Sequence, residues 1–215
     1  VCQSCGAESA KWIGRCNSCG EWNTYVEQKI HKGPVRSGMS ERKDHAVPQK
    51  LDEVSAAPVS RIDLKNSEFN RVLGGGIVPG SMVLIGGEPG IGKSTLALQV
   101  ALQIDKQTLY VSGEESPHQI KLRADRLGGG NGNCQVLAET SLQAIMNQVD
   151  QMKPELLIID SIQTLYSEAI ESAPGTISQV RECAAQLLRL SKESHMPVVL
   201  IGHITKDGRI AGPKV

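Results

Sequence analysis

The sequence has few aromatic residues, no net charge and no hydrophobic run long enough to cross a membrane. Aromatic side chains make up 3% of the 215 residues against 40% hydrophobic residues, so the core is expected to be aliphatic. Lys+Arg and Asp+Glu number 23 each, which excludes a bulk charge that would draw the whole chain to nucleic acid or acidic lipid. No apolar run approaches the roughly 18 residues of a membrane span, and no signal-peptide pattern opens the chain. We therefore expect a cytoplasmic chain with no membrane partner.

One glycine-rich stretch has the form G-x-x-x-x-G-K-S, the Walker A or P-loop pattern. Its residues are Gly87, Glu88, Pro89, Gly90, Ile91, Gly92, Lys93 and Ser94. A buried strand is predicted before it (81–85) and an apolar helix after it (95–104), which is the context the motif requires. Backbone N–H groups of such a loop wrap the phosphates of ATP or ADP, the lysine supplies a positive charge, and the Ser94 hydroxyl binds Mg²⁺. The alternative is a glycine-rich turn without a ligand.

Four cysteines near the N-terminus form two C-x-x-C pairs, Cys2/Cys5 and Cys16/Cys19, separated by ten residues. Each pair makes a tight turn that aims two thiolates at one point, and two such turns complete a tetrahedral Zn²⁺ site. Two disulfides fit poorly with the reducing compartment expected here, and a redox motif would not need a second copy. The sequence therefore predicts a zinc finger.

The predicted finger also holds both tryptophans of the chain. Trp12, Ile13 and Trp22 are expected to form its small apolar core, since so short a unit folds only with its metal. The alternative for Trp22 is stacking on a nucleic-acid base. Lys11 and Arg15 are either phosphate contacts or solvated surface residues.

Composition divides the chain into a finger (1–26), a flexible linker (27–60) and a P-loop ATPase core (61–215). The linker is rich in Lys, Arg, Pro, Ser and Gly and shows no hydrophobic period. Its basic residues are expected to be solvated, with contact to nucleic acid as the alternative. In the core, strands alternate with helices, which predicts an α/β fold with a mostly parallel sheet flanked by helices.

Two acids, Glu114 and Glu115, follow the predicted strand 108–112. A carboxylate at the carboxyl end of a strand beside the P-loop strand lies where an attacking water would be, so one of the two is the candidate general base. Glu114 is preferred. The alternative is that both acids only stabilise the first turn of the next helix.

Two further candidates end apolar runs. Asp160 follows the run 156–159, which is the Walker B pattern that delivers a carboxylate to the Mg²⁺ site. His203 follows the run 197–201 and is either a sensor of the γ-phosphate or a capping or core histidine. Cys134 and Cys183 are interpreted as inert buried thiols.

Taken together, these motifs resemble the RecA-like ATPases, and most closely the RadA (Sms) family of bacterial DNA-repair proteins. The resemblance rests on the finger, the lead-in 73–80, the P-loop extended to Thr95, and the segments 111–116 and 202–208. It implies a hexameric, DNA-stimulated ATP hydrolase with a helicase-like role. Such a motor would bind single-stranded and branched DNA and promote branch migration beside the RecA recombinase. It also implies that two loops, 167–176 and 205–215, face DNA.

The sequence departs from this family at its C-terminal end. The Lys-Asn-Arg-Phe-Gly motif and the Lon-protease-like domain of the family are missing, so we expect a truncated chain. Two other functions stay open. One is a clock-type RecA-like ATPase that works without DNA, and the other is a non-enzymatic adaptor whose conformation is set by ATP.

Overall fold

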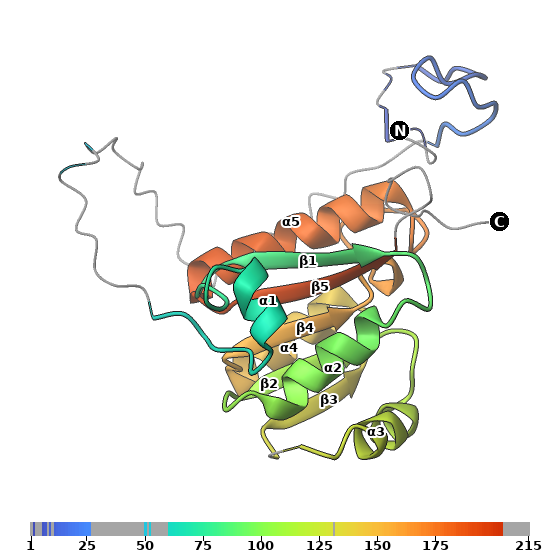
Figure 1. Cartoon of the computed structure of the whole chain (residues 1–215). Coiled ribbons are helices and arrows are strands. Elements are labelled where there is room, and N and C mark those ends of the chain that lie inside the picture. Colours follow the sequence, from blue (N-terminus) through green and yellow to red (C-terminus); the bar gives the residue numbers. More distant parts are fainter. Residues whose placement is uncertain are drawn as a thin grey trace.

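The computed structural model describes residues 2, 6–7, 9, 11–26, 50, 52, 60–130 and 132–203 (Figure 1). Three features predicted from sequence lie outside these residues. They are nearly all of the linker 27–60, the thiol of Cys5, and the second DNA loop, 205–215. The proposed boundaries between finger, linker and core therefore stay a prediction.

The centre of the chain is a parallel five-stranded sheet in the order β1-β5-β4-β2-β3. Its strands are β1 (Met82–Gly87), β2 (Thr108–Ser112), β3 (Cys134–Ala138), β4 (Leu156–Asp160) and β5 (Val198–His203). This confirms the predicted α/β fold class. Because all strands run the same way, the segments that follow β1, β2, β4 and β5 meet at one edge of the sheet.

The prediction that β2 lies beside the P-loop strand was wrong. β2 pairs with β3 and β4, whereas β1 pairs with β5, so two strands separate β1 from β2. The acids that follow β2 are therefore brought near the P-loop across β4 and β5, not from a neighbouring strand.

Helices cover both faces of the sheet (Figure 1). They are α1 (Ser67–Val72), α2 (Lys93–Gln103), α3 (Pro117–Arg126), α4 (Leu142–Met152) and α5 (Ile177–Ser194), with a 3₁₀ turn, η2 (Ile162–Thr164). Local sequence explains the ends of α3. Ser116 and Gln119 form a capping box at its start, and Gly128 and Gly129 follow its end with positive φ, which is typical of a helix C-terminus. None of the described helices is long and apolar enough to cross a membrane.

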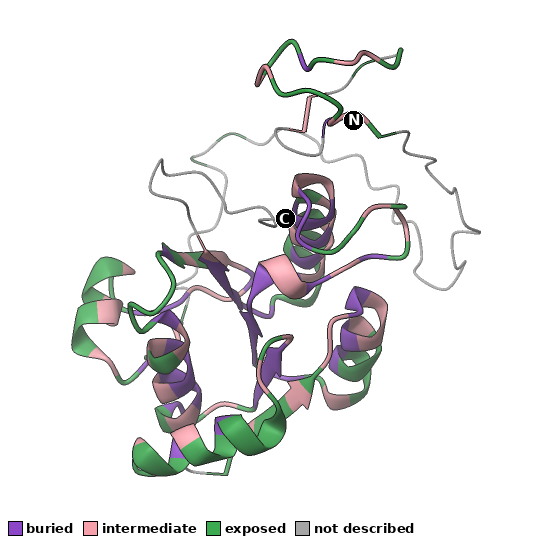
Figure 2. Ribbon diagram, turned by 90° about the vertical axis from the view of Figure 1, so that its right-hand side faces the viewer, coloured by how far each residue is buried: buried purple, intermediate pink, exposed green. Residues whose placement is uncertain are grey.

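Side chains alternate across the strands and build one aliphatic cluster on each face. In the ribbon coloured by burial, the strands in the middle of the sheet are mostly buried (Figure 2). In β4, Leu157 and Ile159 join the cluster beneath α4 and α5, while Leu156 and Ile158 join the one beneath α2 and α3. In α5, Val180, Cys183 and Leu187 are buried, whereas Leu188 is 41% exposed.

Candidate nucleotide site and metal centre

The P-loop connects the end of β1 at Gly87 to the start of α2 at Lys93. Gly90 and Gly92 adopt φ of +82° and +96°, and a Cβ on either would meet no atom within 4 Å. These two glycines are therefore required by the backbone conformation and not by lack of space. Exposed residues make up the middle of the loop, so its surface is open to a ligand. They are Glu88, Pro89, Gly90, Ile91 and Gly92, and Thr95 in the first turn of α2 is exposed as well.

Lys93 is folded into this loop and is only 6% exposed. Its Nζ donates hydrogen bonds to the carbonyl oxygens of Gly87 (2.9 Å) and Glu88 (2.7 Å). Both acceptors are backbone oxygens of the loop itself, so the ammonium lies where the loop would surround phosphate. The first turn of α2 adds the positive end of a helix dipole at the same place.

Ser94 of α2 and Asp160 of β4 are in direct contact through their side chains. The Ser94 Oγ, in the first turn of α2, donates to Asp160 Oδ1, at the end of β4, over 3.0 Å. A hydroxyl and a carboxylate in contact are the two oxygen ligands that P-loop ATPases place around Mg²⁺. The residues present therefore fit the metal that the sequence predicted.

The second oxygen of Asp160 is held by Tyr110, a residue that sequence reasoning did not single out. The Tyr110 hydroxyl donates to Asp160 Oδ2 over 2.6 Å. Tyr110 pairs in register with Ile158, so Asp160 lies two residues further along β4 on the same face. The only signal in the sequence was a tyrosine inside a fully buried apolar strand, where its hydroxyl requires a partner.

Glu114 lies at the same edge of the sheet, after β2. Its Oε1 accepts a hydrogen bond from Ser161 Oγ (2.8 Å) and lies 3.4 Å from His203 Nε2. Ser161 is the residue after Asp160, and His203 is the last residue of β5. Glu114, Asp160 and His203, which the sequence proposed separately, are thus brought together with the P-loop.

Glu115 points to a different partner. Its Oε2 lies 2.7 Å from Arg123 Nη2 of α3, in an ion pair without the alignment of a hydrogen bond. Only 15% of the Arg123 side chain is exposed, so this pair ties the segment after β2 to α3. The two neighbouring acids therefore have different surroundings.

Gly113 sets the path of the chain just before these acids. A Cβ at Gly113 would collide with the side chain of Thr164 and crowd Thr140. Its N–H donates to the carbonyl oxygen of Asp160 over 3.0 Å, which joins the ends of β2 and β4. Sequence reasoning did not identify this close packing.

The finger places three predicted zinc ligands together. The sulfur atoms of Cys2, Cys16 and Cys19 all lie within 4.8 Å of one another, and those of Cys2 and Cys19 are 3.7 Å apart. A tetrahedral site with Zn–S of about 2.3 Å needs sulfur separations of about 3.8 Å, so these thiols fit Zn²⁺. The fourth predicted ligand, Cys5, is not among the described residues.

A backbone hydrogen bond closes each of the two predicted C-x-x-C turns, which are called knuckles below. The N–H of Gly6 donates to Cys2 O and the N–H of Gly20 to Cys16 O, each over 2.8 Å. Gly6 and Gly20 have φ of +74° and +77°, which favours glycine at both positions.

The first predicted DNA loop, 167–176, is fixed from within by Gln179 of α5. The Gln179 Oε1 accepts from Ser167 N (2.8 Å), and its Nε2 donates to Ser172 O (2.9 Å). The structure thus gives this loop a defined shape, and its contact with DNA stays a prediction.

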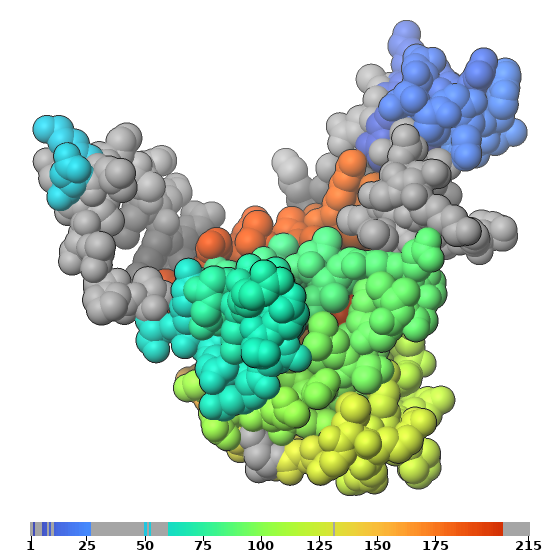
Figure 3. Space-filling view, viewed as in Figure 1, coloured from blue at the N-terminus to red at the C-terminus, as the bar shows by residue number. Residues whose placement is uncertain are grey.

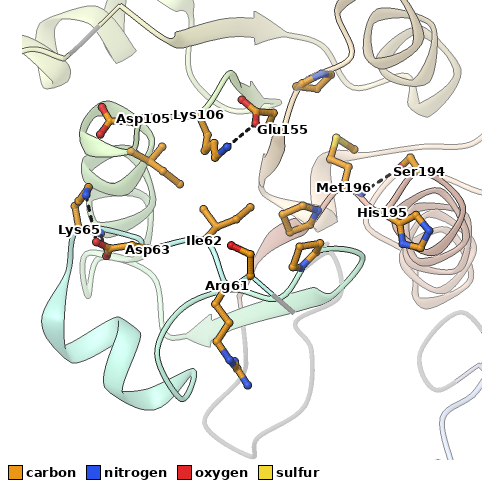
Figure 4. Close-up of a pocket in the computed structure, with 15 residues that line it drawn as sticks. Arg61, Ile62, Asp63, Lys65, Asp105, Lys106, Glu155, Ser194, His195 and Met196 are labelled. Atoms are coloured by element: carbon orange, nitrogen blue, oxygen red, sulfur yellow. Dashed lines mark hydrogen bonds and ion pairs between the residues drawn. The ribbon is translucent and has the colours of Figure 1, made fainter. Parts of the chain in front are cut away.

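A cavity of about 510 Å³ lies at the other edge of the sheet, before the strands begin (Figure 4). Ion pairs line it, including Lys106 with Glu155 and Lys65 with Asp63. Its lining residues precede the strands, whereas the P-loop and Glu114 follow them and Asp160 is the last residue of β4. This cavity is therefore not part of the nucleotide site.

Comparison with known proteins agrees with this geometry. Residues 48–209 match the family model of the AAA domain, and residues 1–27 match that of the rubredoxin metal binding domain. The chain belongs to the AAA domain family. It is 49% identical to the DNA repair protein RadA of Bacillus subtilis (strain 168) over 225 residues, and 48% identical to that of Listeria monocytogenes over 218 residues. The resemblance to RadA proteins that the motifs indicated is confirmed.

The chain spans about half the length of these relatives, since the match covers 100% of this chain and 48% of each of them. Among solved structures, a KaiC-like protein from Pyrococcus horikoshii OT3 superposes with a TM-score of 0.58. That match has 21% identity and covers 71% of this chain and 74% of the other. This likeness supports the α/β fold described above.

Proposed function

We propose that this chain is the ATPase part of a DNA-stimulated motor in recombinational DNA repair. The observation that carries the proposal is the contact of Ser94 with Asp160 beside Glu114, at the edge of the sheet where the P-loop lies. A bound phosphate, a metal and an activated water would all meet there. The names of its relatives, DNA repair proteins, supply the biological setting.

In this proposal each side chain has one role in the hydrolysis of ATP to ADP and phosphate. Lys93 exchanges its loop carbonyls for the β- and γ-phosphates, and Ser94 with Asp160 would hold Mg²⁺. The metal would neutralise charge on the phosphate oxygens. Glu114 accepts a proton from the attacking water, and Ser161 and His203 orient its carboxylate.

Glu114 suits the role of base better than Glu115. The Glu115 carboxylate is engaged by Arg123, whereas Glu114 lies between Ser161 and His203, next to the residue that would bind the metal. A base must reach a water near the γ-phosphate, and geometry decides between candidates before pKa does.

The larger assembly belongs to the proposal as well. We propose that the whole protein, in the cytoplasm, forms a hexamer, binds single-stranded and branched DNA through loops 167–176 and 205–215, and promotes branch migration beside RecA. The finger, holding Zn²⁺ on its cysteines, would be an accessory module joined to the core by the linker.

The test is ATP hydrolysis with and without single-stranded DNA, on this chain and on a longer chain extended past Val215. Stimulation by DNA in either chain is expected. Lys93→Ala should abolish turnover, while Lys121→Ala, which only removes an exposed ion pair with Asp125 on α3, should not. Turnover that ignores DNA in both chains would favour a clock-type enzyme. Nucleotide binding without turnover in both would favour an adaptor.

A further inference from the structure

The two tryptophans lie on the surface of the finger and not in its core. Trp12 is 70% exposed and Trp22 is 68% exposed, which overturns the prediction that they pack together with Ile13 inside it. In the space-filling view, residues 11–26, which include both tryptophans by sequence, belong to the blue lobe (Figure 3). Large aromatic side chains held at the surface of so small a unit mark a contact site.

The two indoles flank the same point of the backbone. An ideal Cβ on Gly14 would lie 3.7 Å from Trp12 Cη2 and 3.8 Å from Trp22 Cζ3. The backbone here is fixed, because the N–H of Asn23 donates to Gly14 O over 2.7 Å. The knuckle of Cys16 and Gly20 lies between Arg15 and Trp22 in sequence, so the metal site supports the same short ribbon.

A cation accompanies the rings. Arg15 and Trp22 are opposite each other in an antiparallel bridge, so their side chains share a face. The Arg15 guanidinium carbon lies 5.9 Å from the centroid of the Trp22 ring, and its Nε donates to Gly20 O over 2.9 Å. Its two Nη groups carry further donors that suit phosphate. Lys11, exposed next to Trp12, adds a second positive charge.

We infer that Trp12, Trp22 and Arg15 form a stacking surface for unpaired bases of single-stranded nucleic acid. Aromatic rings beside cations are the combination that binds unpaired strands without regard to sequence. Tryptophan and arginine are enriched in protein interfaces as well, whereas an exposed lysine beside them, Lys11, favours a phosphate backbone. The inference rests on the proposed function, in that DNA is the ligand, and it assigns the finger a part in holding the strand.

Intrinsic fluorescence tests this surface selectively. The chain has two tryptophans, so all tryptophan emission comes from Trp12 and Trp22. The whole zinc-loaded chain is titrated with oligodeoxythymidylate and, separately, with an abasic deoxyribose-phosphate strand of the same length. Saturable quenching by the thymidylate strand, and much weaker quenching by the abasic strand, is expected. Equal responses to both strands would overturn stacking in favour of backbone contact.

Substitutions measure what each ring contributes. With a dye-labelled strand, Trp22→Ala should weaken binding about 5- to 150-fold and Trp22→Phe less, which is the range for losing one stacked base. Leu122→Ala, which removes another exposed apolar side chain on α3, is the matched control and should leave binding unchanged. Zinc content shows whether each variant keeps its fold. Unchanged affinity in the zinc-loaded double variant Trp12→Ala/Trp22→Ala would overturn the inference.

The result can be separated from a failure of the proposed function. DNA-stimulated ATP hydrolysis without quenching would overturn the stacking surface and leave the proposed motor standing. Quenching without stimulation in this chain or the longer one would support the surface and overturn DNA-dependent hydrolysis. Quenching by purified RecA, the protein partner in the proposed function, and not by DNA would overturn the inference in favour of a protein interface.

Discussion

The hydroxyl of Tyr110 donates a 2.6 Å hydrogen bond to Asp160 Oδ2, while Ser94 Oγ donates to Oδ1 of the same carboxylate over 3.0 Å. Both oxygens of the proposed metal-site acid are therefore engaged, one from the sheet and one from the P-loop helix. Burial raises the pKa of Tyr110, and the negative charge of Asp160 raises it further. The tyrosine therefore keeps its proton, and remains a hydrogen-bond donor, at any pH at which the chain is folded.

Tyr110→Phe should loosen Asp160 without disturbing the packing of β2, because the ring is retained. A buried carboxylate oxygen that loses its donor costs about 1.5–3 kcal/mol in stability. We expect a lower free energy of unfolding and a higher Mg²⁺ concentration for half-maximal ATP hydrolysis. Tyr166→Phe, a like change in the loop after η2, should alter neither. A Mg²⁺ requirement that stays the same in Tyr110→Phe would show that Ser94 alone positions Asp160.

Glu114→Gln and Glu115→Gln form a matched pair of substitutions. Glu114→Gln should lower the turnover number about 10²- to 10⁴-fold while nucleotide binding is kept, since only proton transfer is lost. Glu115→Gln should lower stability, because it leaves the mostly buried Arg123 without its charged partner, and should leave turnover nearly unchanged. Steady-state kinetics and thermal unfolding measure both effects. The reverse pattern would assign the base to Glu115.

Removal of zinc should unfold the finger and leave the ATPase core folded. The exposed positions of Trp12 and Trp22 deprive the finger of its largest apolar side chains, so its fold depends on the thiolate cluster. Metal analysis should find zinc in equal amount to the chain, and Cys16→Ser should release it. Tryptophan emission reports the finger, and the thermal midpoint reports the core. A freshly purified chain without zinc, or a core that melts with the finger, would contradict this expectation.

Cys183 should resist alkylation until the chain unfolds. Burial, with the charge of Glu182, raises its pKa from 9.0 to about 12. The unfolded chain therefore releases this proton near pH 9 while the native chain keeps it, so stability falls as pH rises above about 9. Mass-spectrometric labelling with and without denaturant measures the protection. Cys134, half-buried with its pKa raised to about 11, should label sooner. Rapid labelling of native Cys183 would refute its burial.

Much of the site was predictable because buried parallel strands are continuous apolar runs in sequence. The runs that end before Glu114, Asp160 and His203 were recognised in this way, and their carboxyl ends do meet at one edge. Strand order was not predictable in the same way, since an apolar run does not reveal its neighbours. β5 comes last along the described sheet, yet it inserts between β1 and β4.

The positions of the aromatic side chains were the least predictable from the sequence. Trp12 and Trp22 were expected inside the finger and lie outside it, while Tyr110 was passed over and holds Asp160. Residue type alone does not decide whether a tryptophan or tyrosine is buried or exposed, because its polar atom can be satisfied by a protein partner inside or by water at the surface.

The pairing of β1 has a consequence for how a nascent chain acquires its nucleotide site. Within the part of the chain that the structure describes, β1 pairs with β5, which lies at the other end of the sheet's sequence. On the ribosome, the strand that leads into the P-loop emerges early and must wait until Val198–His203 has been synthesised. The backbone N–H and C=O groups of β1 lack their β5 partners during that interval. The strand is then open to a chaperone, and the P-loop that follows it is not yet held in place.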